Sequence, residues 1–267
     1  MTSCTALLRT LLVAALSLNG FATPEQIHNT VGAAGALKVF VEPGGSFSPG
    51  LGTFGVAFRM SNFMAVAGSF TPEPRSPSGT GSSVWWVEEQ RGALLLRTEV
   101  CGVKRATPQG DAFILAARAR LTNTSGEAVS TTLSVSIAPE GPAGGPIHAL
   151  AFGRHAFSIE GHPVLIAQSA STGAILASGA LEPRPFLPQA EAAVTSEAGE
   201  CRGEMLFDVK VPAKGSVTLG FLCPVLAGRI AGEGGPLQPD PGLEFYRGLN
   251  VDDIFAEAEG PAGGKAK

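Results

Sequence analysis

Two adjacent tryptophans, Trp85 and Trp86, precede Glu88 and Glu89 and form the best candidate binding site in the sequence. An indole ring can stack on a sugar ring while a nearby carboxylate accepts hydrogen bonds from the sugar hydroxyls, and ligand sites often combine apolar walls with a few polar groups. A strand alternates its side chains, so the simpler interpretation is that one tryptophan fills the core and the other covers a sheet edge. Trp85, Trp86 and Glu88 are the candidate carbohydrate-binding residues.

Catalytic groups with a convincing spacing are missing from the sequence. It contains no G-x-S-x-G nucleophile elbow, no H-E-x-x-H motif, no Walker loop and no Rossmann glycine pattern. Glu88 and Glu89 should point to opposite faces of a strand, which separates these two acids. His148 and His155 could approach each other in the fold, although loop or surface histidines are the simpler interpretation. We therefore assign no catalytic residue and expect no cofactor.

Three cysteines, Cys101, Cys201 and Cys223, follow the N-terminal segment. One disulfide could form in an oxidising compartment, and Cys201 and Cys223 can pair only if their segments are neighbours. The sequence has no C-x-x-C motif and no Cys/His spacing typical of a zinc site, so no metal site is expected. Scattered cysteines such as these more often act as small buried hydrophobic side chains.

The composition is typical of a folded domain with many turns. The 267 residues are 44% hydrophobic and 16% charged, with a formal charge of −4, which argues against a basic nucleic-acid-binding protein. The 35 glycines and 20 prolines favour an all-β domain over a helical bundle. All-β domains can reach this length as one unit, so a single domain is the default expectation.

Residues 1–22 have the order typical of a secretory signal peptide. Arg9 precedes the apolar run 11–18, and small residues precede the expected cleavage after Ala22. The apolar run is too short to cross a bilayer, so we expect no membrane span after cleavage. The alternative is a buried N-terminal helix of the mature fold. The pattern predicts a secreted or periplasmic protein.

Two strong alternating patterns predict antiparallel hairpins. Apolar and polar residues alternate over 117–121 and 129–137, and the Asn123 to Gly126 segment supplies turn residues between them. The same logic pairs 204–211 with 217–221 through the turn 212–215. Asn123-Thr124-Ser125 also matches a glycosylation sequon, but a role in the turn explains it sufficiently.

Shorter apolar segments predict further strands. They bring the total to about ten and are Leu37 to Val41, Gly55 to Met60, Val84 to Val87, Leu94 to Val100, Phe157 to Ile159 and Val164 to Ala167. Because almost no helix is available to cover a sheet, two packed antiparallel sheets are expected. The Pro/Ser/Gly-rich stretches 71–83 and 232–242 are predicted to be mobile linkers.

The segment 250–259 predicts a short amphipathic helix. Asn250 is a good N-cap, Asp252 and Asp253 lie in the first turn, and Gly260 and Pro261 end the helix. A helix this short is marginal unless its apolar stripe packs on a partner surface. The candidate docking residues of the stripe are Val251, Ile254, Phe255 and Ala258. Deletion of residues 250–267 is expected to leave the rest of the domain folded.

Four segments together resemble the N-terminal β-sandwich of bacterial six-hairpin glycosidases. They are 47–56 (FSPGLGTFGV), 120–127 (RLTNTSGE), 138–145 (APEGPAGG) and 251–259 (VDDIFAEAE), and the resemblance spans about residues 35–259. It implies a large two-sheet antiparallel sandwich, called a super-sandwich and similar to galactose mutarotase, in front of an (α/α)6 barrel that carries the catalytic acids. The sequence departs from the family after Glu259, where the barrel would begin, so no catalytic residue of the family can be transferred.

The resulting hypothesis is an all-β protein with residues 1–22 as signal peptide and residues 23–242 as the super-sandwich. Residues 243–259 form a linker and connector helix, and residues 260–267 a disordered tail. The leading function is a non-catalytic accessory domain of a carbohydrate-active protein, giving structural support or weak carbohydrate binding. One alternative is a mutarotase-like or epimerase-like enzyme that uses His148 or His155 with a glutamate. The other is an interaction module whose helix docks on a separately encoded (α/α)6 barrel.

Overall fold

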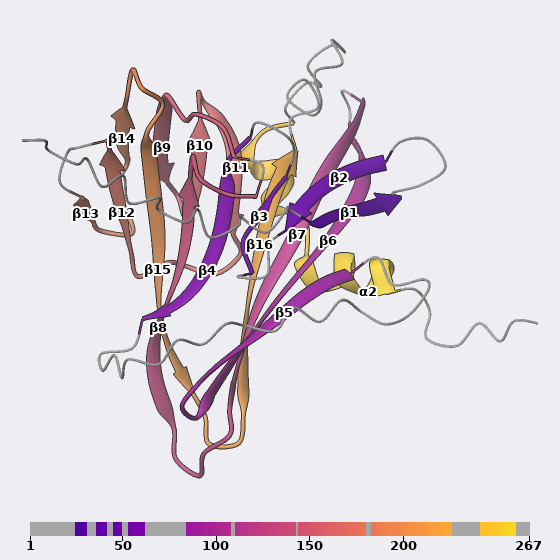
Figure 1. The fold of residues 1–267 in the computed structure, drawn as a ribbon, viewed down its shortest axis with the longest axis vertical. Coiled ribbons are helices and arrows are strands. Elements are labelled where there is room, and N and C mark those ends of the chain that lie inside the picture. Colours follow the sequence, from indigo (N-terminus) through magenta and orange to yellow (C-terminus); the bar gives the residue numbers. More distant parts are fainter. Residues whose placement is uncertain are drawn as a thin grey trace, which may run out of the picture.

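The computed structural model describes residues 25–30, 36–41, 45–49, 53–61, 84–107, 110–142, 144–179, 183–225 and 241–259. These residues form two eight-stranded antiparallel sheets and two short helices (Figure 1). The expected all-β sandwich with a short C-terminal helix is confirmed. The predicted signal peptide, the tail 260–267, the stretch 71–83 and nearly all of 232–242 lie outside the described residues.

The first sheet contains eight strands, four of which lie in the first half of the chain. In spatial order they are β1 (Glu25–Thr30), β2 (Ala36–Val41), β3 (Phe47–Ser48), β4 (Gly55–Ser61), β8 (Val129–Ala138), β15 (Cys201–Val211), β12 (Gly173–Ser178) and β13 (Arg184–Phe186). All neighbouring strands of this sheet are antiparallel.

The second sheet also contains eight strands, and its two longest members lie next to one edge strand. In spatial order they are β14 (Ala192–Thr195), β9 (Ala149–Gly153), β10 (Ala156–Ile159), β11 (His162–Ala167), β16 (Ser216–Val225), β7 (Gly110–Asn123), β6 (Leu94–Thr107) and β5 (Val84–Arg91). Each of the six shorter segments predicted as strands lies within one observed strand, which confirms these predictions.

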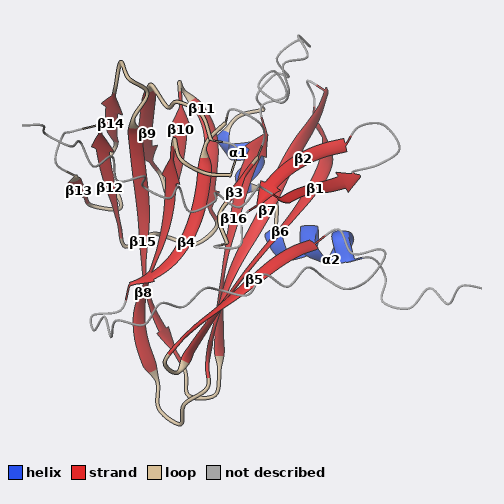
Figure 2. Cartoon of the chain, in the orientation of Figure 1, coloured by secondary structure: helices blue, strands red, loops and turns tan. Residues whose placement is uncertain are grey.

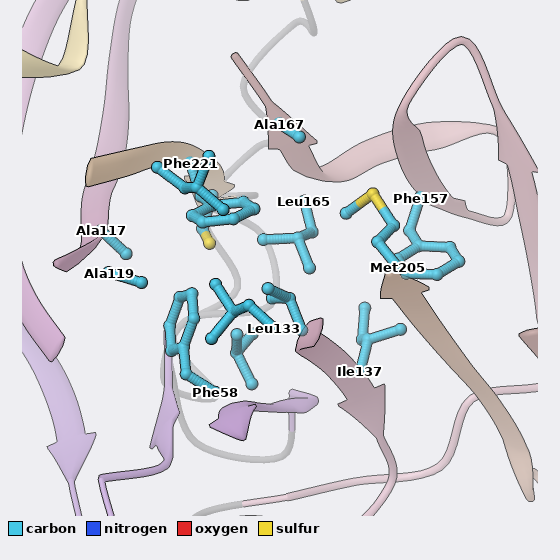
Figure 3. Close-up of a cluster of buried hydrophobic side chains, with 14 of the residues drawn as sticks. Phe58, Ala117, Ala119, Leu133, Ile137, Phe157, Leu165, Ala167, Met205 and Phe221 are labelled. Carbon is cyan, nitrogen blue, oxygen red and sulfur yellow. The ribbon is translucent and has the colours of Figure 1, made fainter. Parts of the chain in front are cut away.

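The main core lies between the two sheets because each strand turns alternate apolar side chains inward. In β15, buried and more exposed positions alternate over all 11 residues. Phenylalanines from both sheets meet there: the ring centroids of Phe58 and Phe221 are 5.2 Å apart, and those of Phe207 and Phe221 are 5.5 Å apart. Figure 3 shows part of this cluster, with Leu133 and Leu165 near Phe221 and Met205 beside Phe157.

The two predicted hairpins are wrong, although all four of their strands form. β7 pairs with β6 and β16, whereas β8 pairs with β4 and β15, so the turn after Asn123 carries the chain from one sheet to the other. The turn after Val211 makes the same crossing between β15 and β16. An alternating pattern shows which face of a strand is apolar. It does not show whether the next strand pairs beside it or packs against it across the core.

The two crossing turns lie side by side and are joined by hydrogen bonds. The backbone N–H of Asn123 donates to the carbonyl of Gly215 at 2.9 Å, and that of Lys214 donates to the carbonyl of Ser125 at 3.1 Å. The Asn123 amide donates to the carbonyls of Glu127, Val211 and Pro212 at 2.7, 3.3 and 3.1 Å. The Asn123 side chain thus connects both turns, and it is itself buried.

The two helices, α1 (Leu243–Arg247) and α2 (Val251–Glu259), pack on the outer face of the second sheet (Figure 2). This face carries a second apolar cluster that includes Val251, Ile254 and Phe255; α2 contacts β5, β6, β7 and β16, and α1 contacts β11. Asn250 is the N-cap of α2, since its Oδ1 accepts the N–H of Asp252 at 2.8 Å. Neither helix is long and apolar enough to span a membrane.

A tight contact joins the start of β4 to the 138–144 segment. A Cβ atom on Gly55 would lie 2.0 Å from the carbonyl oxygen of Glu140, and one on Gly141 would lie 2.6 Å from the Cα of Gly55. Backbone atoms cannot yield as a flexible side chain can, so these two glycines allow the segments to approach.

We expect Gly55→Ala to lower the free energy of unfolding by about 2 kcal/mol, because the added methyl group must push two backbone segments apart. Chemical denaturation with a fluorescence readout measures the effect. Gly126→Ala is the matched control, since a Cβ there would meet no atom within 4 Å. Equal stabilities of the two variants would contradict the close contact.

Candidate functional site

The structure separates the two tryptophans of the candidate binding site. Trp85 points into the core between the sheets and is 4% exposed, whereas Trp86 lies on the outer face of β5 and is partly exposed. Trp85 therefore fills the core, as the simpler interpretation of one tryptophan requires. Of the two tryptophans, Trp86 is the one that a ligand can reach. Glu88 lies on the same outer face, two residues further along the strand.

Trp86 and Glu88 share one partner, Arg97 of β6. The guanidinium carbon of Arg97 lies 4.2 Å from the centroid of the Trp86 ring, and its Nη1 lies 3.3 Å from Oε1 of Glu88. The strand register explains this arrangement, because Glu88 lies opposite Arg97 and Trp86 lies opposite Glu99. One side of the indole ring is therefore covered by a cation, and the site is a mixed aromatic and ionic surface.

The ionic surface continues across the sheet towards α2. The Nε of Arg97 donates to Oε1 of Glu99 at 2.9 Å, and the Nε of Arg118 donates to Oε2 of the same carboxylate. The Arg118 guanidinium lies 4.1 Å from the centroid of the Phe255 ring and 3.9 Å from Oδ1 of Asp252. We call Trp86, Glu88, Arg97, Glu99 and Arg118 the outer ladder.

Glu99 is the buried member of the outer ladder. Glu99 is 3% exposed, and both of its carboxylate oxygens accept hydrogen bonds from guanidinium groups. Both carboxylate oxygens of Glu99 are therefore occupied by guanidinium donors, and neither is open to a proton of a substrate. The arrangement therefore suits positioning of Arg97 and Arg118 and does not suit general base catalysis.

The apolar stripe of α2 has a partner within its own chain. Val251, Ile254 and Phe255 are at most 1% exposed, and Ala258 is half-buried beside them. Gln168 fixes the start of the helix, since its Oε1 accepts the N–H of Val251 at 3.2 Å and its Nε2 donates to the carbonyl of Leu249. A second protein could bind these four stripe residues only if α2 first left the sheet.

The two histidines considered for catalysis lie at opposite ends of β9. His148 precedes the strand and its Nδ1 lies 3.2 Å from the carbonyl oxygen of Ser196, whereas His155 follows the strand and contacts Ser171. The five residues of β9 place the two rings on the order of 15 Å apart. The structure does not bring them together in one site.

The three cysteines described by the structure are not joined to one another by a disulfide. Cys101, Cys201 and Cys223 are fully buried, as the interpretation of small hydrophobic side chains requires. Burial raises the pKa of the Cys201 thiol, whose Sγ lies 3.5 Å from the carbonyl oxygen of His148. Among the described residues, no three His, Cys, Asp or Glu side chains are close enough to hold a metal ion.

Sequence reasoning missed Arg97, Glu99 and Arg118. The sequence carries a usable signal for the first two. Arg97 and Glu99 lie on the opposite face of the same strand from Leu94 and Leu96, and the 91–94 turn sets the register of this strand with β5. Reading this register would have placed Arg97 opposite Glu88. The contact of Arg118 with α2 had no such signal, since it joins residues far apart in the sequence.

The described residues define an all-β protein of the two-sheet antiparallel sandwich class, with helical cover on one outer face. In the comparisons with known proteins, no family model matches the sequence and no curated protein matches it significantly.

Proposed function

We propose that the protein is a secreted, non-catalytic accessory domain of a carbohydrate-active protein, and that it contacts saccharide weakly through the outer ladder. The observation that carries the proposal is Trp86, a partly exposed indole on a sheet surface beside Glu88 and Arg97. Aromatic walls with a few fixed polar groups are the usual composition of a small-molecule site. The ion pairs hold the polar groups in place before a ligand arrives.

The ladder offers both kinds of contact that a sugar uses. The indole supplies an apolar surface for the C–H groups of the ring, and Glu88 and Arg97 supply an acceptor and donors for hydroxyl groups. The side chains of Glu88 and Arg97 are 31% and 33% exposed, so both can be reached from solvent. The Arg97 guanidinium occupies one side of the indole, so the sugar must displace it or use the remaining ring surface. This competition keeps the affinity low.

The non-catalytic part of the proposal is supported by the paired state of the ladder acids and by the separation of His148 from His155. The family resemblance implies an (α/α)6 barrel beside the sandwich, and a separately encoded barrel is the candidate protein partner. With Val251, Ile254 and Phe255 already buried, the remaining docking surface on α2 is its exposed side, which carries Asp253 and Ala256.

Binding is tested by titrating the mature chain with cello-, xylo- and malto-oligosaccharides and following tryptophan fluorescence. We expect saturation with a Kd on the order of 1 mM for at least one series. Trp86→Ala should weaken binding at least tenfold by calorimetry, while Gln90→Ala, on the same face of β5, should leave it unchanged. Lack of binding to every series, or an unchanged Kd in Trp86→Ala, would reject the ladder as a saccharide site. Turnover of any glycan that one acid substitution abolishes would reject the non-catalytic role.

A further inference from the structure

A cavity of about 610 Å³ lies between the α1–α2 segment and the outer face of β11 and β16. It is separate from the outer ladder, which lies on β5, β6 and β7. Its walls are partly apolar, and its polar side chains come from three places in the chain. The lining residues used below are His155, Gln168, Leu222, Tyr246, Arg247 and Asn250. A cavity of this size is in the range that holds a small organic molecule.

The cavity carries one sign of charge. Arg247 is the only ionised side chain among its lining residues, all of which the structure describes. Arg247 pairs with the acid Glu244, whose Oε1 lies 3.6 Å from Nη1 of Arg247 but 2.5 Å from Nη2 of Arg154. Two arginines therefore share one carboxylate, which leaves a net positive charge beside the cavity.

His155 presents a hydrogen-bond donor to the same cavity. Its Nδ1 accepts the backbone N–H of Ser171 at 3.1 Å, so the proton of the neutral ring is on Nε2. Burial, together with the charge of Arg247, lowers the pKa of His155 below its ordinary value, which keeps the ring neutral at pH 7. With Nδ1 occupied by Ser171, the Nε2–H is the group left for a ligand.

The turn that carries His155 has an unusual backbone for its residues. Arg154 and His155 form the two-residue connection between β9 and β10 with φ values of 52° and 57°. Such turns favour Asn and Gly, and a left-handed backbone costs other residues roughly 1 kcal/mol each. The Arg247 guanidinium donates to the carbonyl of Arg154 and so holds the turn beside the cavity. Strain of this kind commonly marks a functional side chain.

We propose that this cavity binds a small organic carboxylate, with the carboxylate against Arg247 and the Nε2–H of His155 and the body of the ligand against Tyr246 and Leu222. A guanidinium and a neutral N–H donor match the acceptor-only character of a carboxylate. Asn250 adds an amide donor, because its Oδ1 accepts the N–H of Asp252 and its NH₂ group is a donor. This site does not depend on saccharide binding by the outer ladder.

The test uses the mature full chain and two acids with neutral counterparts. D-glucuronate is compared with D-glucose, and benzoate with benzamide, by isothermal titration calorimetry at pH 7. We expect at least one acid to bind with a Kd of about 1 mM or tighter, and its neutral counterpart to bind at least tenfold more weakly. Binding of neither acid, or equal binding of an acid and its counterpart, overturns the proposal.

The decisive variant is His155→Asn. The Asn Oδ1 can take over the hydrogen bond from Ser171, and Asn tolerates the left-handed backbone, so the melting temperature should stay equal or rise. Affinity for the bound acid should fall at least tenfold because the Nε2–H is lost. Arg247→Gln should weaken binding at least as much, whereas Arg202→Gln, which removes an exposed positive charge on the first sheet, should not. Unchanged affinity in a folded His155→Asn protein overturns the assignment.

Discussion

Replacement of Phe255 by alanine is expected to lower the free energy of unfolding by about 4 kcal/mol. The Phe255 ring is fully buried between α2 and the outer face of the second sheet, and deletion of such a ring removes its transfer free energy and leaves a cavity. The loss also removes the ring on which the Arg118 guanidinium packs. Urea denaturation followed by circular dichroism measures the change.

The matched control for this prediction is Asp253→Ala on the exposed side of the same helix. We expect this substitution to lower the free energy of unfolding by less than about 1 kcal/mol, because it removes only the interaction of the carboxylate with the helix dipole. If Phe255→Ala were no more destabilising than this control, α2 would not belong to the folded core of the protein.

The position of α2 also changes the expected result of a truncation. The sequence alone predicts that removal of residues 250–267 leaves the sandwich folded. In the structure, that deletion uncovers Val103, Ile114 and Leu222 on the outer face of the second sheet. We now expect the truncated chain to aggregate or to unfold at a lower temperature, because a large apolar patch would face water.

The substitution Asn123→Asp is expected to destabilise the protein by about 3 kcal/mol at pH 7. The Asn123 amide is 1% exposed and donates to three backbone carbonyls in the two crossing turns. A carboxylate has nearly the same shape but no donor, so it would place a buried negative charge against three acceptors. Thermal denaturation should show a lower melting temperature, and the loss should diminish at acid pH, where the carboxyl group regains a proton.

Thr124→Ala is the control, since it removes one exposed hydroxyl bond to the carbonyl of Ala93 and should change stability by less than about 1 kcal/mol. A stable Asn123→Asp variant would show that the two turns hold together without this amide. Glycan attachment at Asn123 is also incompatible with the structure, because the nitrogen that would be modified is buried and fully used.

The sequence predicted the strands better than their partners. The alternation in β8 and β15 is set by burial of one face, which any two-layer arrangement satisfies, so both strands could be found without knowledge of the sheet. Sheet membership depends on which strand edges meet, and that is decided by residues far apart, such as Ala117 and Phe221. Short turns rich in Asn, Gly and Pro serve equally well within a sheet and between sheets.

The candidate site was predictable only where its residues lie on one strand or on adjacent strands of a hairpin. Trp86 and Glu88 lie on one strand, so their shared face follows from period two. Their common partner Arg97 required only the register of the adjacent hairpin. The cavity beside His155 could not be predicted, because it forms where the α1–α2 segment meets β11 and β16, and no local pattern encodes that contact.

The order of elements along the chain has a consequence for biosynthesis. The outer face of β5, β6 and β7 is covered by α2, which follows all 16 of the strands that the structure describes. During translation, β6 and β7 can pair early as a local hairpin, but their second apolar face has no cover until the chain has reached residue 259. The nascent chain must therefore be protected from self-association until that point, and completion of the fold is coupled to the arrival of α2.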